Sequence, residues 1–245
     1  MKNLNIIITM GGIGLRFTKA GYNMPKYMIE AKGKTLFEWS LESLKGFFEV
    51  ANKFIFVVKK EDCAKDFIKK HCQKFNIIPE IIELTHVTDG QATSAKLGIE
   101  KCNLEEGILI YNIDTYVEPF EMKYEDLKGD GSIPCFKAEG NHWSFVKTDD
   151  KGQVVEVQEK NRISDNCSLG AYYFSSGKLY LKIYNEFYEK NSVSILKEKY
   201  IAPMYNYMIK MGYKLSMSLV ESKKVHVLGT PEELSAFIAE EENEQ

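Results

Sequence analysis

A glycine-rich turn directly after an apolar strand is the feature that most constrains what this chain can fold into. Residues 5–9 read N-I-I-I-T, and residues 10–16 follow as M-G-G-I-G-L-R. Glycines have no Cβ, so the backbone N–H groups of such a turn can approach phosphate oxygens closely. Arg16 adds a planar fork for these oxygens, and Lys26, ten residues later, adds a point charge. The segment indicates a polyphosphate pocket, whereas the simpler alternative is a tight strand-to-helix turn with one exposed arginine.

Two common glycine signatures fit this turn poorly. A dinucleotide-binding turn has the pattern G-x-G-x-x-G, with an acidic residue about 20 positions later. Here Gly12 and Gly14 lead to Phe17, which stands where the third glycine belongs. A Walker-type loop, G-x-x-x-x-G-K-[ST], is absent from the sequence. A nicotinamide-dependent dehydrogenase is therefore only a remote alternative.

Length and composition fit one large α/β domain. At 245 residues the chain can bury a substantial core, and 44% hydrophobic with 27% charged residues is an ordinary globular balance. The formal net charge of −3 argues against a nucleic-acid partner, whose binding needs a basic surface. No run of 18 apolar residues is present, and the first strand is too short for a signal peptide, so we expect a cytoplasmic protein without a membrane partner. The dispersed cysteines and histidines argue against a structural zinc site.

Apolar strands and amphipathic helices alternate along the first half of the chain. Thr35 and Glu38 form a capping-box pattern, followed by apolar residues at helical spacing. We expect strands at 54–58, 77–84 and 108–113, and helices at 35–48, at 61–72 and from residue 90. This order predicts an α/β, Rossmann-like three-layer fold with a mainly parallel mixed sheet and helices on both faces. Ligands bind at the carboxyl ends of the strands in such sheets.

The second half of the chain has a different pattern. Residues 142–146 and 154–158 alternate around a D-D-K-G turn, which predicts a hairpin. We expect further strands at 170–174, 215–220 and 225–227, helices at 178–189 and 194–211, and Pro231 at the first position of a last helix. No linker or repeat separates the halves, so residues 1–245 are expected to form a single domain.

Asp114 directly follows the strand expected at 108–113 and is a candidate metal ligand. Mg²⁺ prefers oxygen ligands and bridges from a carboxylate to substrate phosphates. The alternative is an aspartate that caps the next turn. Because the glycine-rich turn is expected at the same edge of the sheet, the pattern favours the metal site.

Together these residues resemble the signature of the nucleotidylyltransferases, G-G-x-G-x-R followed by P-K. Members of this family couple a nucleoside triphosphate to a phosphorylated metabolite and release pyrophosphate. The resemblance implies a nucleotide-diphospho-sugar transferase-like fold, with a nucleotide half at about 1–130 and an acceptor half at about 131–245. It further implies that Arg16 holds the leaving pyrophosphate, that Lys26 stabilises charge at the α-phosphate, and that Asp114 binds Mg²⁺, or Mn²⁺ in its place.

The resemblance also assigns residues to the two halves of the site. The nucleotide-binding residues are Met10, Gly11, Gly12, Gly14, Arg16, Lys26, Thr85, Asp89, Gly90 and Gln91. The acceptor-binding residues are Asn112, Trp143, Glu159, Lys160, Arg162, Gly170 and Tyr172. The simpler interpretations are a solvated pair at a hairpin end for Glu159 and Lys160, and a strand glycine at a bulge for Gly170.

Several positions depart from the family pattern. Val227 stands two residues before the glycine of G-T-P-E-E-L, where sugar-1-phosphate members have a second metal-binding aspartate. Thr85 occupies the place of a base-reading glutamine, so Gln91 becomes an alternative reader of the base. Tyr27 stands where sugar-phosphate members usually have a proline. These departures point away from an ordinary sugar-1-phosphate enzyme. The P-K-Y at 25–27, the N-I-D-T-Y at 112–116 and the H-W-S-F at 142–145 together resemble a bacterial capsule-pathway branch, which transfers CMP from CTP to L-glutamine phosphate.

The leading interpretation is a Mg²⁺-dependent nucleotidylyltransferase whose partners are a nucleoside triphosphate and a phosphorylated small molecule. A sugar-1-phosphate enzyme that uses another triphosphate is the alternative within the same class. A module that binds a nucleotide without turnover is the alternative from another class, and the presence of Arg16, Lys26 and Asp114 argues against it. The sequence does not identify the base of the triphosphate or the acceptor, and it does not show whether the chain forms a homo-oligomer.

Overall fold

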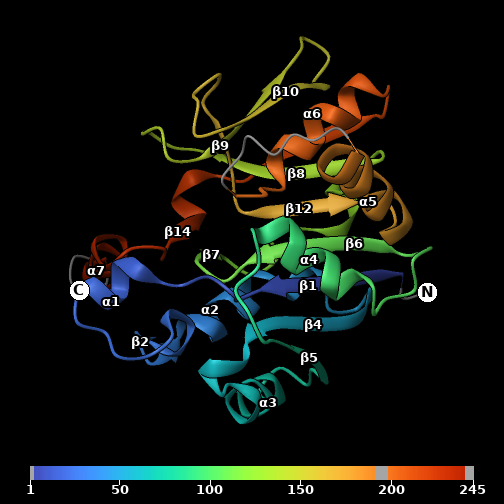
Figure 1. The fold of residues 1–245 in the computed structure, drawn as a ribbon. Helices are drawn as coiled ribbons and strands as arrows, with labels where there is room; N and C mark the ends of the chain where they lie inside the picture. The colour runs from blue at the N-terminus through green and yellow to red at the C-terminus, as the bar shows by residue number, and fades with distance from the viewer. Residues whose placement is uncertain (1–2, 191–197, 241–245) are drawn as a thin grey trace.

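One mixed sheet runs through both halves of the chain. The fold is seen in a computed structural model that describes residues 3–190 and 198–240, and within these residues ten strands form the sheet (Figure 1). From one edge to the other the strands are β10 (Val154–Glu159), β9 (Ser144–Thr148), β11 (Asn166–Ser168), β8 (Gly131–Lys137), β12 (Ala171–Phe174), β6 (Gly107–Asn112), β1 (Leu4–Thr9), β4 (Ala51–Lys59) and β5 (Pro79–Leu84), and β13 (Leu215–Leu219) also pairs with β8. The predicted α/β fold class is confirmed.

The strands of the first half are parallel, whereas those of the second half are largely antiparallel. β1 lies between β4 and β6 and is parallel to both, with β5 parallel to β4 beyond it. β12 then runs antiparallel to β6 and to β8. Because parallel strands point the same way, β1 and β6 end side by side, with Thr9 paired to Asn112. The glycine-rich turn and Asp114 therefore start from the same edge of the sheet, as the sequence predicts.

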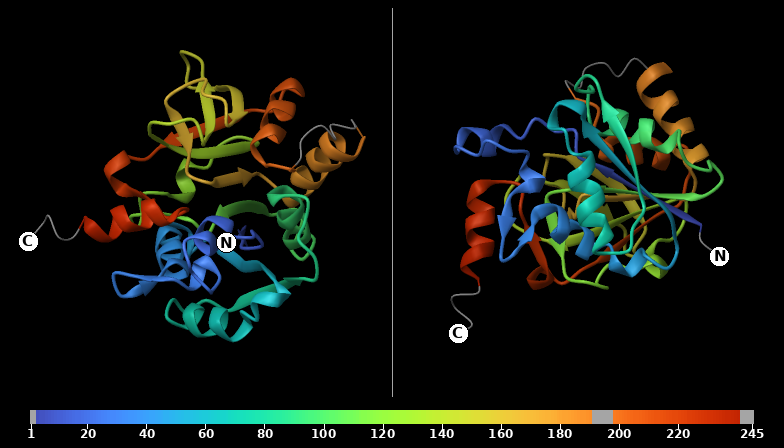
Figure 2. Two further views of the ribbon diagram at one scale, coloured as in Figure 1. Left: turned by 60° about the vertical axis from the view of Figure 1, so that its left-hand side comes forward. Right: turned by 90° about the horizontal axis from the view of Figure 1, so that it is seen from below.

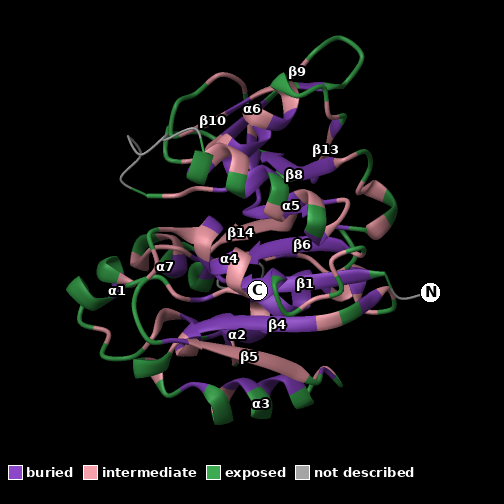
Figure 3. Ribbon diagram, turned by 45° about the vertical axis from the view of Figure 1, so that its right-hand side comes forward, coloured by how far each residue is buried: buried purple, intermediate pink, exposed green. Residues whose placement is uncertain are grey.

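Helices cover both faces of the sheet. One face carries α2 (Leu36–Ser43) and α3 (Lys65–Gln73), and the other carries α4 (Gln91–Ile99), α5 (Gly177–Tyr184) and α6 (Ala202–Lys210). Along β1, Ile6 and Ile8 enter the first core and Ile7 enters the second, since side chains alternate across a strand. β1 and β6 are almost wholly buried between the two layers (Figure 3).

A third, smaller core lies beyond the carboxyl edge of the sheet. Here Phe17 of α1 (Leu15–Lys19) packs with Leu234 and Phe237 of α7 (Pro231–Ala239). Two short antiparallel pairs accompany it, β7 (Thr115–Val117) with β14 (Val225–Val227) and β2 (Glu30–Ala31) with β3 (Lys34–Thr35). Figure 2 shows α7, in red, beside the blue N-terminal segment in both views. The last helix is thereby brought to the edge where the glycine-rich turn lies.

The capping box predicted for α2 is confirmed. Thr35 N donates to Glu38 Oε2 at 2.9 Å, and Glu38 N donates to Thr35 Oγ1 at 3.2 Å. The helix ends at Ser43 rather than near residue 48, and a 3₁₀ turn, Lys45–Phe47, continues the chain. Gly46 in this turn lies against the backbone of Met122, where a Cβ would come within 2.2 Å of the carbonyl oxygen. The helix stops because the chain must make this close approach.

The helix predicted from residue 61 is wrong in its first turn. Lys60–Asp62 form a 3₁₀ turn, Cys63 has a φ of 48°, and α3 begins at Lys65. A left-handed residue cannot continue a right-handed helix. α5 ends before its predicted limit and passes into a π-helical turn at Asn185–Lys190.

The remaining predictions of secondary structure have mixed outcomes. Residues 194–197 of the next predicted helix lie outside the described residues, and α6 begins at Ala202. Strands β2, β3, β7, β8 and β11 were not predicted, while Pro231 starts the last helix as expected. Among the described helices, none is long and apolar enough to cross a membrane.

Candidate active site

A cavity of about 790 Å³ opens at the carboxyl edge of the parallel strands. It is lined by the glycine-rich turn, by the start of α4, by the end of β6 and by residues of the antiparallel half. The predicted site residues in its wall are Met10, Gly11, Gly12, Gly14, Arg16, Lys26, Asp89, Gly90, Gln91, Asn112, Asp114, Trp143, Glu159, Gly170 and Tyr172. Thr85, Lys160 and Arg162 do not line it. One cavity thus brings both predicted halves of the site together.

The glycine-rich turn leaves β1 and starts α1 under tight backbone constraints. Gly14 caps α1 with a φ of 67°, a left-handed conformation that glycine adopts without strain. A Cβ on Gly11 would lie 2.9 Å from Leu84 Cδ1, so a side chain at this position would require the Leu84 side chain to shift. Arg16 is exposed in the short helix, and within the described residues its guanidinium has no ion-pair partner. The turn leaves a cationic fork free at the cavity.

Lys26 and Asp114 meet at the centre of the site. Lys26 Nζ lies 2.7 Å from Asp114 Oδ2, and the two side chains are 21% and 31% exposed. Tyr27, the next residue, is buried, and its hydroxyl donates to Asp62 Oδ2 at 2.8 Å. Burial raises the pKa of Tyr27 well above its usual range, and the bond to Asp62 adds to this shift, so the hydroxyl stays a donor. The hydrogen bond to Asp62 therefore anchors the backbone next to Lys26 to the 3₁₀ turn at Lys60–Asp62.

The loop before α4 is held by a segment from the antiparallel half. Lys199 N donates to Asp89 O at 2.7 Å, and Ala92 N donates to Lys199 O at 3.0 Å. Lys199 Nζ also lies 2.9 Å from Asp89 Oδ2. Gly90 has a φ of 147°, and a Cβ there would come within 2.4 Å of Lys199 O. Glycine is needed at this position because the Lys199 backbone lies directly against it.

The Gln91 side chain is turned toward the strand ends. Its Nε2 donates to Thr9 Oγ1 at 3.1 Å and to Asn112 Oδ1. Asn112 in turn packs against Gly170, where a Cβ would lie 2.5 Å from Asn112 Nδ2. The predicted glycine of the acceptor half is thus explained by this close approach, together with its φ of 74°. These contacts hold the Gln91 side chain in the cavity wall, whereas Thr85 is exposed and does not line the cavity.

The wall formed by the antiparallel strands is acidic and aromatic. Ser144 Oγ donates to Glu159 Oε2 and lies 3.1 Å from the Tyr172 hydroxyl. Burial raises the pKa of the Glu159 carboxyl above its usual value, and the Ser144 hydrogen bond and the Lys160 charge only partly offset this. Trp143 stands beside this cluster in the cavity wall. The arrangement can receive a group that is both cationic and partly apolar.

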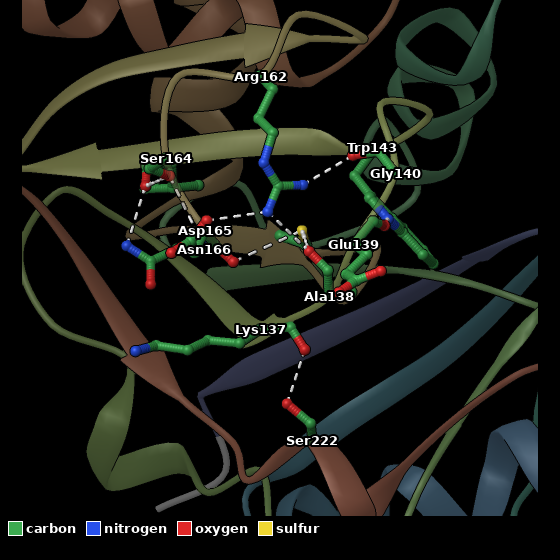
Figure 4. A network of polar contacts seen from close by, with 12 residues as sticks. Lys137, Ala138, Glu139, Gly140, Trp143, Arg162, Ser164, Asp165, Asn166 and Ser222 are labelled. Atoms are coloured by element: carbon green, nitrogen blue, oxygen red, sulfur yellow. Dashed lines mark hydrogen bonds and ion pairs between the residues drawn. The ribbon is translucent and has the colours of Figure 1, made fainter.

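The two predicted cations of the acceptor half do not line the cavity. Lys160 Nζ donates to the Tyr200 hydroxyl at 2.9 Å, and Tyr200 itself lines the cavity. Arg162 donates to Gly140 O at 2.7 Å and to Ala138 O at 3.0 Å. As Figure 4 shows, Arg162 holds the loop that leads to Trp143. In this structure it positions the wall and does not face the cavity.

Several cavity residues were missed by the sequence reasoning. They are Thr88, Ser94, His142, Ser144, Glu198, Tyr200, Gly229 and Glu233. Glu233 belongs to the G-T-P-E-E-L motif, whose second acidic residue was the available signal. The motif predicts an acidic residue in the first turn of a helix, but it does not predict the direction in which the carboxylate points.

The residues present can accept a divalent cation. A Cβ built on Gly229 would lie 3.5 Å from Asp114 Oδ2 and 3.4 Å from Glu233 Oε2, so two carboxylates border one small space. Mg²⁺ is commonly held by one or two carboxylates together with substrate phosphates, and carboxylate oxygen is the donor it prefers. Within the described residues, no group of three or more His, Cys, Asp or Glu is arranged for a metal. The donor set therefore fits a metal that shares its coordination with phosphates.

A solved structure with high similarity decides the family. The crystal structure of a nucleoside-diphosphate-sugar pyrophosphorylase from Vibrio cholerae RC9 is 35% identical in sequence, with a TM-score of 0.88. The match covers 95% of this chain and 99% of that one. The chain belongs to the nucleotidylyltransferase family. As such it is an enzyme of the nucleotidyltransferase class, and the predicted family is confirmed.

More distant comparisons agree with this membership. The bifunctional protein GlmU of Methanocaldococcus jannaschii is 24% identical over 209 residues. The match covers 84% of this chain but 47% of GlmU, so the chain spans about half the length of that relative. Two solved structures share the fold over nearly all of both chains. These are the inositol-1-phosphate CTP transferase from T. maritima, with 16% identity and a TM-score of 0.76, and the CTP:phosphocholine cytidylyltransferase from Streptococcus pneumoniae, with 19% and 0.73. No family model matches the chain.

Proposed function

We propose that this nucleotidylyltransferase transfers CMP from CTP to L-glutamine phosphate, releases pyrophosphate, and serves capsule polysaccharide synthesis in the cytoplasm. The observation that carries the transfer is the single cavity in which Arg16, Lys26 and Asp114 face a separate acidic and aromatic wall. The first group suits a triphosphate, and the second suits an acceptor. Two proteins of the same fold are described as using CTP, which supports the choice of base.

The proposed reaction is an in-line displacement at the α-phosphorus. An oxygen of the acceptor phosphate forms a bond to the α-phosphorus, and the bond to the bridging oxygen breaks, so that pyrophosphate leaves with the electron pair. Because the nucleophile is already an ionised phosphate, no general base is needed. The main task is to neutralise and align anions.

Each cationic residue takes one part of this task. Lys26 neutralises charge that develops around the α-phosphate, and Arg16 binds the departing pyrophosphate bidentately. Asp114 orients Lys26 through their contact at 2.7 Å. Asp114 also holds a divalent cation, Mg²⁺ or Mn²⁺, which when bound supplies further neutralisation of the phosphate oxygens.

The acidic wall supports an amino-acid acceptor. The ammonium group of a phosphorylated amino acid requires an anionic partner, and Glu159 is a partly buried carboxylate beside Trp143 and Tyr172. In such a site a carboxylate and aromatic faces bind a cation together. A sugar phosphate has no ammonium group, so it would leave the burial of the Glu159 charge offset only by the Ser144 hydrogen bond and by Lys160 Nζ at 3.8 Å.

Pyrophosphate release tests the proposal. Each of the four nucleoside triphosphates is assayed with L-glutamine phosphate, phosphocholine and a set of sugar 1-phosphates. We expect CTP with L-glutamine phosphate to give the highest kcat/KM. Formation of CDP-sugars with L-glutamine phosphate untouched would reject the acceptor, and preference for another triphosphate would reject the base.

A sugar-1-phosphate nucleotidylyltransferase is the second candidate. Two observations favour it, the 35% identity to a protein described as a nucleoside-diphosphate-sugar pyrophosphorylase and the G-T-P-E-E-L motif at residues 229–234. Turnover of a sugar 1-phosphate in the same assay identifies it.

A further inference from the structure

The second metal-binding aspartate of the family pattern is missing from this chain. Val227 stands in its place at the end of β14 and lines the cavity. The Val227 Cα is paired with Thr115, next to Asp114, so the position itself is in the expected place. An isopropyl group cannot bind a cation, so a second anionic ligand at this point would have to be another carboxylate that lines the cavity.

Glu233 brings a carboxylate to this point from the first turn of α7. Its backbone N donates to Thr230 Oγ1 at 3.2 Å, which is half of a capping box. In α2 the equivalent Glu38 completes the box, because its Oε2 accepts from Thr35 N at 2.9 Å. For Glu233 the described residues show no such return bond, and its carboxylate lines the cavity instead. The N-terminal cap of α7 therefore does not engage the Glu233 carboxylate.

The Glu233 and Asp114 carboxylates both lie close to Gly229. A Cβ on Gly229 would lie 3.4 Å from Glu233 Oε2 and 3.5 Å from Asp114 Oδ2, so the absence of a side chain creates the space between the two carboxylates. The other Glu233 oxygen, Oε1, lies 3.9 Å from His142 Nε2, beyond hydrogen-bond distance. Both carboxylates border the cavity on the side where Lys26 stands.

We propose that Glu233 replaces the missing aspartate and, together with Asp114, holds the divalent cation of the nucleotidyl transfer. The inference rests on the proposed function for the presence of that cation. It explains why Val227 is tolerated, since the second anionic ligand comes from α7 and not from β14. It also explains the glycine at position 229, because a side chain there would enter the space between the carboxylates.

Mn²⁺ binding tests the proposal without relying on turnover. The protein is titrated into Mn²⁺ and the non-hydrolysable α,β-methylene analogue of CTP, and the water-proton relaxation rate reports Mn²⁺ that becomes protein-bound. Glu233→Gln keeps size and hydrogen bonding but removes the charge, and we expect it to weaken Mn²⁺ binding at least about tenfold. Glu232→Gln is the matched control, because Glu232 lies in the same helical turn but is exposed to solvent. We expect the control to bind Mn²⁺ like the wild type.

Two further variants separate a ligand from a residue that only supports the fold. Val227→Asp in the Glu233→Gln background restores a carboxylate at the family position, and we expect it to recover most of the lost Mn²⁺ affinity. Gly229→Ala meets both carboxylates at ordinary contact distance, so it should fold, yet it fills the space between them and should weaken Mn²⁺ binding.

Unchanged Mn²⁺ affinity in Glu233→Gln would overturn the inference, as would an equal loss in Glu232→Gln. The result can be told apart from failure of the proposed function. If CTP is not the substrate, the same titration is run with the α,β-methylene analogue of the triphosphate that supports turnover, and the prediction for Glu233 is unchanged.

Discussion

Lys26 Nζ lies 2.7 Å from Asp114 Oδ2, a contact that joins a 3₁₀ turn after α1 to the end of β6. The two residues are 88 positions apart in the sequence, and they meet because β1 and β6 are adjacent parallel strands that end together. A lysine beside the carboxylate at a strand end puts opposite charges where phosphates would bind. Both side chains remain partly exposed, so each can turn from its partner to a ligand.

Lys26→Ala should abolish nucleotidyl transfer. Removing one preorganised donor that stabilises charge developing in a transition state typically costs about 10²–10³ in kcat. The measurement is pyrophosphate release at saturating triphosphate and acceptor. Lys19→Ala is the control, because Lys19 is an exposed lysine of the nearby α1 that does not line the cavity. Wild-type turnover in Lys26→Ala would mean that the catalytic site lies elsewhere.

Tyr27→Phe should lower kcat while it leaves the triphosphate KM nearly unchanged. The Tyr27 hydroxyl donates to Asp62 Oδ2 at 2.8 Å, and Asp62 is also held by Lys59 at 3.2 Å. Loss of one such hydrogen bond costs about 0.5–1.5 kcal/mol of folding free energy, which leaves the fold intact. The loosened turn would then place Lys26 less accurately.

The split between kcat and KM identifies this role. Steady-state kinetics is compared with the urea unfolding of the same protein. A stability loss with unchanged kcat would mean that Tyr27 supports the fold and does not position Lys26.

The sequence was sufficient to predict the location of residues in the glycine-rich turn and at the strand ends. The turn at residues 10–16, Lys26 and Asp114 all fall on the expected edge, because parallel strands force their carboxyl ends together. The close approach of Asn112 to Gly170 likewise agrees with the glycine expected there. Such positions are fixed by topology, which strand and helix patterns reveal.

Side-chain directions that depend on tertiary contacts could not be predicted from the sequence. Arg162 and Lys160 were expected to face the acceptor, yet Arg162 is bonded to the carbonyls of Ala138 and Gly140. Which way a long side chain turns depends on loop carbonyls that no local pattern shows. Glu233 was missed for the same reason, since its motif predicts a helix start and not the direction of its carboxylate. The predicted helix is also interrupted at Cys63 by a left-handed φ, which cysteine as a residue type does not predict.

Gly90→Ala should destabilise the protein and weaken triphosphate binding. At Gly90 the φ is 147° and a Cβ would meet Lys199 O at 2.4 Å, so both the backbone and the neighbouring segment oppose a side chain. A residue in this region costs about 1–3 kcal/mol before any clash is counted. Gly152→Ala is the control, because Gly152 also has a positive φ, of 77°, but nothing lies within 4 Å of its Cβ position. Urea unfolding and triphosphate titration should show a clearly larger loss at Gly90, and equal losses would contradict the role given to Lys199.

Glu159→Gln should stabilise the protein at neutral pH and not at acid pH. Burial raises the pKa of the folded-state carboxyl above its ordinary value of 4.5, with the Ser144 hydrogen bond and the Lys160 charge opposing the shift. The folded protein thus holds the Glu159 proton more tightly than the unfolded chain, so ionisation lowers stability as the pH rises from about 4.5 through the raised pKa. The amide does not ionise and avoids this loss. Urea unfolding of both proteins across this range should give a stability difference in favour of Glu159→Gln that grows with pH and levels off above the raised pKa, whereas a difference that is constant with pH would show that burial does not disfavour the Glu159 charge.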